Sequence, residues 1–121
     1  SKKETNERIA LAECIEQFII QGLPTGKIDA TILSIVIQCF DDKHYIVRQR
    51  ACNCFALLLD TKYRNLAERR LCEAAIDPSH YVRSQILNLC RNKKIGTSEI
   101  RAELFDILTN DANYAIRIGC K

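Results

Sequence analysis

Three aspartates recur in one local pattern, in which a carboxylate precedes an arginine by six residues. The aspartates are Asp42, Asp77 and Asp111, and the arginines are Arg48, Arg83 and Arg117. A row of carboxylates could bind a cation or serve in acid–base catalysis. Each aspartate, however, lies where a helix is expected to begin, and a carboxylate there caps backbone amides, a contribution of about 0.5 to 2 kcal/mol. The pattern therefore favours a structural role.

The cysteines and histidines are the other candidates for chemistry. Six of the seven cysteines lie beside apolar residues in segments expected to be helical. Cys52 and Cys54 are two positions apart, which on a helix turns their side chains about 200° from each other and keeps them from one zinc ion. His44 and His80 recur with the repeat, and neither a nucleophile–histidine spacing nor a Gly-rich phosphate loop is present. We therefore predict a non-catalytic chain with no metal and no cofactor.

The spacing of the pattern indicates how these residues are positioned. Arg48 and Arg83 are 35 residues apart and Arg83 and Arg117 are 34 apart, the length of a helical hairpin repeat. Breaker and turn residues separate the segments at 22–26, 60–61 and 92–97. Asp77 is expected as an N-cap, with Pro78 as the first helical residue. Helices are predicted at residues 4–21, 29–40, 43–59, 63–76, 78–91, 98–108 and 112–121.

Apolar residues recur at helical spacing in the second helix of each predicted pair. One stripe consists of Val47, Ala51, Cys54, Phe55 and Leu58. The next consists of Val82, Ile86, Leu89 and Cys90, and Ile116 and Cys120 begin a third. The first helix is expected to face the core with Leu11, Ile15, Phe18 and Ile19, although Asn6 and Ala12 stand where the other units have aspartate and arginine.

This pattern resembles HEAT repeats, helix–turn–helix units whose second helix opens with an Asp, a Val-Arg pair and a small apolar residue. The resemblance covers residues 29–121 and, in a degraded form, the first helix. It implies an all-α, right-handed α-α superhelix of about three and a half hairpins in a single domain, 1–121, with units at about 1–22, 29–59, 63–92 and 98–121. It also implies a ladder of hydrogen bonds from Asp42 and Asp77 to Arg83 and Arg117.

In a HEAT-like stack the second helices line a concave groove, so the face opposite each apolar stripe is expected to meet a partner. Amide and charged side chains on this face suit hydrogen bonds to a protein or a peptide. The predicted partner-binding residues are Glu13, Gln17, Gln49, Asn53, Ser84, Asn88 and Arg91. The same face carries Cys52, Ala56 and Leu87.

These features predict a non-catalytic protein-binding module or scaffold in the cytoplasm. More narrowly, the chain resembles small bacterial HEAT-like proteins, which are thought to act as scaffolds or as immunity proteins against a toxin. The competing class is a nucleic-acid binder similar to the HEAT-like DNA glycosylases, but the net charge of +3 and only two basic groove residues, Arg91 and Lys121, argue against it. No apolar run reaches the roughly 20 residues needed to cross a bilayer, and no feature indicates the oligomeric state.

Overall fold

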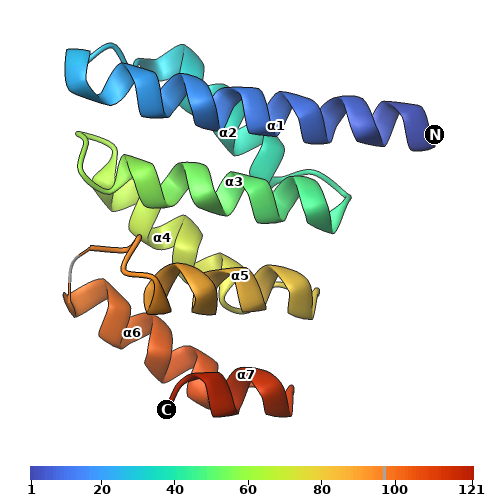
Figure 1. The fold of residues 1–121 in the computed structure, drawn as a ribbon, viewed down its shortest axis with the longest axis vertical. Helices are drawn as coiled ribbons and strands as arrows, with labels where there is room; N and C mark the ends of the chain where they lie inside the picture. The colour runs from blue at the N-terminus through green and yellow to red at the C-terminus, as the bar shows by residue number, and fades with distance from the viewer. Residues whose placement is uncertain (97) are drawn as a thin grey trace.

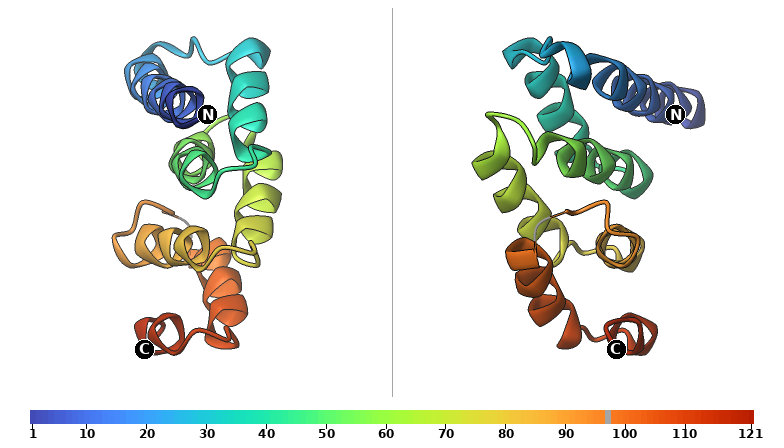
Figure 2. Two further views of the ribbon diagram at one scale, coloured as in Figure 1. Left: turned by 90° about the vertical axis from the view of Figure 1, so that its right-hand side faces the viewer. Right: turned by 60° about the vertical axis from the view of Figure 1, so that its left-hand side comes forward.

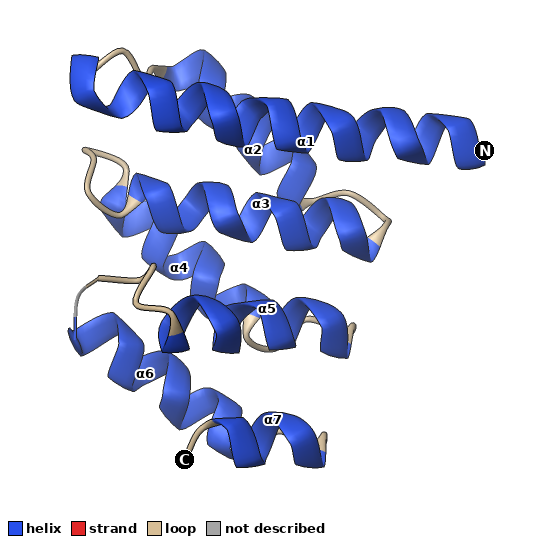
Figure 3. Cartoon of the chain, viewed as in Figure 1, coloured by secondary structure: helices blue, strands red, loops and turns tan. Residues whose placement is uncertain are grey.

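The computed structural model describes residues 1–96 and 98–121, which form helices and no strand (Figure 3). The helices are α1 (Lys2–Gly22), α2 (Ala30–Phe40), α3 (Tyr45–Leu58), α4 (Arg64–Ala74), α5 (His80–Arg91), α6 (Ser98–Thr109) and α7 (Tyr114–Gly119), with a short 3-10 helix, η1 (Leu23–Thr25), after α1. Within these ranges the all-α prediction and the seven predicted α-helices are confirmed. Thr97, at the end of the predicted 92–97 turn, lies outside the described residues.

The helices form two layers (Figures 1 and 2). In one layer α1, α3, α5 and α7 lie side by side, each in contact with the next, and α2, α4 and α6 form the layer behind them. The hairpins are α2–α3, α4–α5 and α6–α7, and α1 takes the place of a second helix at the head of the stack. The core therefore runs along the stack, because each hairpin buries apolar surface against its neighbours. The hand of the superhelix and the single-domain assignment stay predictions.

The second helices begin later than predicted. Their N-caps are His44, Ser79 and Asn113, and each of these side chains accepts a hydrogen bond from a backbone N–H in the first turn. The prediction that Asp77 is an N-cap is therefore wrong, and Pro78 precedes the helix.

Each repeated aspartate lies two residues before the N-cap residue of its helix. Oδ1 of each accepts the backbone N–H of the residue two positions later, at 2.8 Å in all three cases. Such an Asx turn directs the chain into the helix and satisfies an amide that has no helical partner. The second carboxylate oxygen stays available for another donor.

The predicted apolar stripes of α3 and α5 are confirmed. Val47, Phe55, Val82 and Ile86 have no exposed surface, and the other members of these stripes are buried as well. Ile116 of α7 is buried in the equivalent position. Residues at the same position of the repeat therefore occupy equivalent places in the core.

The predicted stripe of α1 is partly wrong. Leu11 and Phe18 are 46% and 55% exposed, whereas Ala12 and Ile19 are buried. The reason is that α1 heads its layer and packs on α2 and α3 from one side. Apolar residues that turn toward its other side remain in solvent.

Candidate functional site

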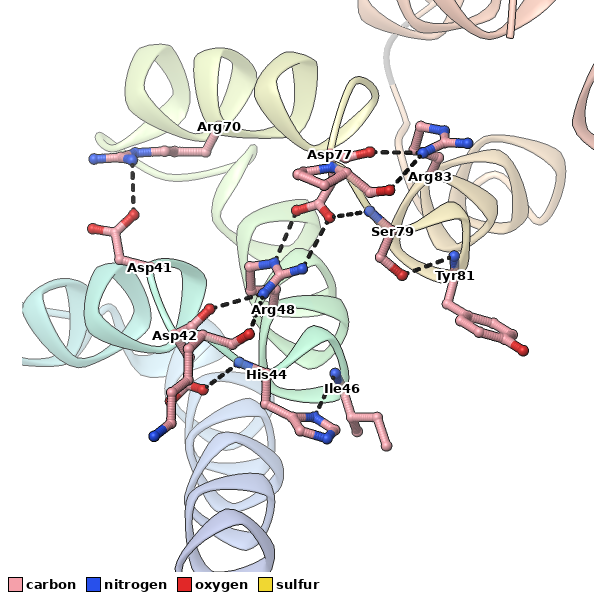
Figure 4. Close-up of polar contacts among 12 residues, drawn as sticks. Asp41, Asp42, His44, Ile46, Arg48, Arg70, Asp77, Ser79, Tyr81 and Arg83 are labelled. Atoms are coloured by element: carbon pink, nitrogen blue, oxygen red, sulfur yellow. Dashed lines mark hydrogen bonds and ion pairs between the residues drawn. The ribbon is translucent and has the colours of Figure 1, made fainter. Parts of the chain in front are cut away.

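Arginine–aspartate pairs link consecutive units of the stack. In each pair the guanidinium donates two parallel hydrogen bonds, from Nε to Oδ2 and from Nη2 to Oδ1. The Nε–Oδ2 distances are 2.6 Å for Arg8–Asp42, 2.9 Å for Arg48–Asp77 and 2.7 Å for Arg83–Asp111. Figure 4 shows the middle pair. Bidentate geometry, with each carboxylate at most 10% exposed and Arg8 the most exposed guanidinium at 32%, makes these pairs stronger than ordinary surface ion pairs.

The direction of this ladder is opposite to the one predicted. Asp42 and Asp77 do not meet Arg83 and Arg117; instead, the arginine of one unit meets the aspartate of the next. The cause is visible at Arg48, whose Nη1 donates to the carbonyl oxygens of Asp42 and Lys43 at 3.0 and 2.9 Å. This contact at the start of its own helix leaves the Nε edge pointing toward the following unit (Figure 4).

Arg8 is a functional member of the ladder that the sequence interpretation missed. The repeat pattern puts Ala12 where the other units have an arginine, but Arg8, four residues earlier on α1, makes the contact with Asp42. Arg8 and Asp42 are 34 residues apart, whereas the arginine and aspartate of the other two pairs are 29 and 28 apart. The spacing of the repeat therefore gave no signal for Arg8.

The ladder sets the electrostatics of its carboxylates. Burial by itself raises the pKa of Asp42, but the hydrogen bonds from Arg8 and from the His44 backbone outweigh it, so the pKa lies below its ordinary value. The pKa of Asp111 is lowered in the same way against burial, by Arg83 and the Asn113 backbone. These carboxylates are therefore held ionised by structure, which suits an architectural role better than proton transfer.

A cleft of about 310 Å³ opens in the layer of second helices, across α1, α3 and α5. Its apolar part comes from Ile20, Ala56, Leu57 and Leu89, and its polar part is Glu16, Asn53, Gln85, Asn88, Asn92 and Lys94. A cleft of this size with a few converging polar groups is the usual form of a small binding site.

Lys94 and Asn92 reach the cleft because the chain reverses directly after α5. Lys93 has a φ of 57°, in the left-handed region, and the backbone N–H of Lys94 donates to the carbonyl of Leu89 at 2.9 Å. This helix-ending turn returns the following residues toward the helix they have just left. The sequence interpretation treated this segment only as a turn and missed its contribution.

Asn53 is the centre of a polar chain across three helices. Its Nδ2 donates to Glu16 Oε1 on α1 at 3.2 Å, and its Oδ1 accepts from Gln85 Nε2 on α5 at 2.6 Å. Both ends of the Asn53 amide are therefore engaged within the protein. Asn88, which also lines the cleft, is exposed and its side chain makes no hydrogen bond with the described residues.

The other residues predicted to bind a partner do not lie in this cleft. Glu13 and Gln17 lie beside a separate shallow hollow on α1, and Glu13 is 3.5 Å from Arg50 in an exposed ion pair. Gln49 is 3.5 Å from the carbonyl of Tyr81, while Ser84 and Arg91 lie on α5 outside the cleft. The structure thus brings together Asn53 and Asn88 of the predicted set with Glu16 and Gln85, which also line the cleft.

Three residues on the predicted groove face are buried instead. Cys52, Ala56 and Leu87 retain at most 6% of their surface. The physical reason is that neighbouring second helices pack directly on one another, so the side of α3 and α5 that faces the next helix belongs to the interior. Only part of the face opposite the apolar stripe is therefore open to a partner.

The described residues show neither a group of three or more metal-ligating side chains in one place nor a helix both long and apolar enough to cross a membrane. Of the arginines beside the second-helix layer, Arg48 and Arg83 are occupied by the ladder. The cation that lines the cleft is Lys94, which is exposed.

Stacked hairpins with equivalent core positions and a repeated inter-unit hydrogen bond define an α-helical repeat protein. The HEAT repeat family matches residues 32–61, which span most of α2, all of α3 and the start of the turn that follows. This match identifies residues 32–61 as a HEAT repeat and supports the resemblance to HEAT-like repeats that the sequence pattern indicated. Comparison with the curated proteins and with solved structures gives no significant match.

Proposed function

We propose that this HEAT-like protein is a non-catalytic interaction module that binds a protein or a peptide through the cleft across α1, α3 and α5. The observation that carries the proposal is the composition of the cleft, in which the side-chain amides of Asn88 and Asn92, with no hydrogen bond to the described residues, lie beside apolar residues. HEAT repeats typically mediate protein interactions, and this cleft supplies a place for one.

The amide groups suit a peptide backbone. Asn88 and Asn92 are exposed at the rim, and each primary amide offers both a donor and an acceptor, which matches the N–H and C=O of a peptide unit. Ile20, which is 42% exposed, and the half-buried Leu57 line the same cleft and give an aliphatic side chain of the partner an apolar surface to cover.

The charges favour a protein partner over a nucleic acid. Binding along a phosphate backbone needs cations on each successive unit, because affinity there comes from charge neutralisation. Here Arg48 and Arg83 already bind carboxylates, and Glu16 adds a negative group to the cleft. The four buried, unpaired cysteines suit a reducing compartment, so we assign the protein to the cytoplasm.

The experiment is affinity purification from cells of the natural source, with bound proteins quantified for three versions of the chain. Asn88→Glu places a carboxylate on the open rim and is expected to reduce capture of a specific partner at least about tenfold, since like or unpaired charge in an interface is costly. The matched control is Asn65→Glu, on the exposed surface of α4. Asn53 is avoided because its substitution would break the Glu16–Asn53–Gln85 chain.

Loss of a defined partner with Asn88→Glu and its retention with Asn65→Glu supports the proposal. If every specific partner stays bound to Asn88→Glu, or leaves with both variants, the cleft is not the binding surface. A salt-sensitive shift of DNA or RNA that depends on Lys93 and Lys94 would place the function in the nucleic-acid class instead.

A further inference from the structure

Glu16 carries a negative charge in the cleft across α1, α3 and α5, and no cation of the described residues pairs with it. The side chain is half-buried, and its Oε1 accepts a hydrogen bond from Asn53 Nδ2 at 3.2 Å. The other carboxylate oxygen, Oε2, has no donor among the described residues. Lys94 is the second charged residue of the cleft lining, and it makes no ion pair with Glu16. Because the carboxylate is partly withdrawn from water, it attracts an opposite charge more strongly than a fully exposed one would.

One turn earlier on the same two helices, a carboxylate does have a cation. Glu13 on α1 lies 3.5 Å from Arg50 on α3. Glu16 and Asn53 follow these two residues by three positions each, so they form the next pair across α1 and α3. At this second pair an amide stands where the first has an arginine. A neutral donor satisfies one oxygen of Glu16 and leaves its charge uncompensated.

The carboxylate of Glu16 is oriented by a chain of hydrogen bonds, whereas the ammonium of Lys94 is not. Gln85 Nε2 on α5 donates to Asn53 Oδ1 at 2.6 Å, and Asn53 in turn donates to Glu16. A group held in this way loses little side-chain freedom when it binds. Lys94 is exposed, its side chain makes no hydrogen bond with the described residues, and it follows α5, which α3 separates from α1 (Figure 1). The fixed charge that a ligand meets in this cleft is therefore negative.

We propose that the cleft selects a peptide segment with a basic side chain, arginine or lysine, whose cation binds Glu16. This inference rests on the proposed function and specifies the chemistry of its partner. The cation donates to Oε2, the oxygen that Asn53 leaves open. Ile20, one turn after Glu16 on α1, and Leu57 line the same cleft and contact the aliphatic stem. A carboxylate beside apolar surface matches a basic side chain, which has an apolar stem and a charged end.

The test uses capped tripeptides that differ only in the central side chain, between two alanines. The central residue is arginine, citrulline, which has nearly the same shape without the charge, or glutamate. Each peptide is titrated into the ¹⁵N-labelled chain up to about 10 mM, a range that reaches millimolar affinities. The side-chain amide signals of Asn53, Asn88 and Asn92 are followed by NMR. We expect saturable shifts with the arginine peptide and binding at least about tenfold weaker with the citrulline peptide, because a hydrogen bond between two charged groups is stronger than one from a neutral donor.

Matched variants of the chain make the test specific. Glu16→Gln removes the charge but keeps a side-chain oxygen that can accept from Asn53, and it is expected to weaken binding of the arginine peptide at least about tenfold. The control is Glu13→Gln, the same substitution one turn earlier in an exposed ion pair, which is expected to bind like the parent chain. Lys94→Gln is expected not to weaken binding. The backbone amide spectrum of each variant shows whether it is folded.

Equal affinity for the arginine and citrulline peptides, or an equal loss with Glu16→Gln and Glu13→Gln, would overturn the choice of a basic side chain while leaving the cleft as a peptide site. Tighter binding of the glutamate peptide, lost in Lys94→Gln, would overturn it in favour of an acidic side chain. The absence of a saturable shift with any of the peptides would also contradict the inference. The proposed function is tested separately, by capture of a partner with Asn88→Glu, so the two can fail independently.

Discussion

Arg48 on α3 binds Asp77, in the turn before α5, through hydrogen bonds of 2.9 and 3.1 Å, while its remaining nitrogen is held by carbonyl oxygens at the start of α3 (Figure 4). A single side chain therefore connects the openings of two consecutive second helices. Arg83 repeats the arrangement with Asp111 one unit further along. The recurrence in the sequence is thus a recurrence of hydrogen bonding as well as of apolar packing.

The ladder predicts how stability responds to acid. Asp42 and Asp111 have a pKa below the ordinary value of 3.8 in the folded protein, because their arginine and backbone donors outweigh the effect of burial. A carboxyl with a lowered folded-state pKa stabilises the fold above the unfolded pKa and loses that contribution as the pH falls through the folded pKa. We expect the free energy of unfolding, measured with urea, to fall steeply below about pH 4.

The control for this pH dependence is a pair of Asp→Asn variants. Asp111→Asn is expected to be less stable near neutral pH and to lose less stability on acidification. Asp60→Asn, at an exposed aspartate with no ion pair among the described residues, is expected to follow the parent profile. An unchanged acid slope in Asp111→Asn would show that the ladder does not cause the effect.

The thiols are predicted to differ widely in reactivity. Cys14 is exposed, whereas Cys52 and Cys54 are buried, and burial raises the pKa of Cys54 to about 12. Since the thiolate is the reactive form, a thiol reagent at pH 8 should label Cys14 quickly and the buried pair only after urea is added. Cys14→Ser should abolish the fastest phase and leave the slower labelling of the half-buried Cys72 and Cys120. A fast phase that survives this substitution would mean that the core opens or that another thiol is accessible.

Two phenylalanines offer a direct comparison of the core with the outer side of α1. Phe55 has no exposed surface and Phe18 is 55% exposed. Phe55→Ala is expected to lower the free energy of unfolding by about 3 to 5 kcal/mol, because it leaves a cavity in the core. Phe18→Ala should change it by less than about 0.5 kcal/mol. A large loss of stability with Phe18→Ala would indicate that a second surface covers this side of α1.

The fold could be predicted because its signals are local and repeated. Val47, Val82 and Ile116 stand at the same place in each unit, and a helical spacing around them specifies which side is buried. The exceptions lie on α1, where Leu11 and Phe18 fit the spacing but have no layer neighbour on their side. Periodicity identifies an apolar face but not whether a neighbour covers it.

The direction of the ladder and the lining of the cleft depend on how neighbouring helices are shifted relative to one another. The spacing of residues in the sequence does not contain this information. Asp77 lies between Arg48 and Arg83 in the chain, and only the stagger of α3 against α5 decides which arginine it meets. Lys94 enters the cleft through the reversal at Lys93, and both ends of the Asn53 amide are hydrogen-bonded in the cleft, by Glu16 and Gln85. These contacts come from three different helices and a turn.

A pair of double-mutant cycles tests the stacking register most directly. The first combines Arg48→Ala with Asp77→Ala, and the second combines Asp42→Ala with Arg83→Ala, each measured by urea unfolding. The observed ladder predicts a coupling energy of about 1.5 to 3 kcal/mol in the first cycle, since this pair is bidentate and mostly buried, and none above about 0.5 kcal/mol in the second. Strong coupling between Asp42 and Arg83 with none between Arg48 and Asp77 would contradict the register described for the stack.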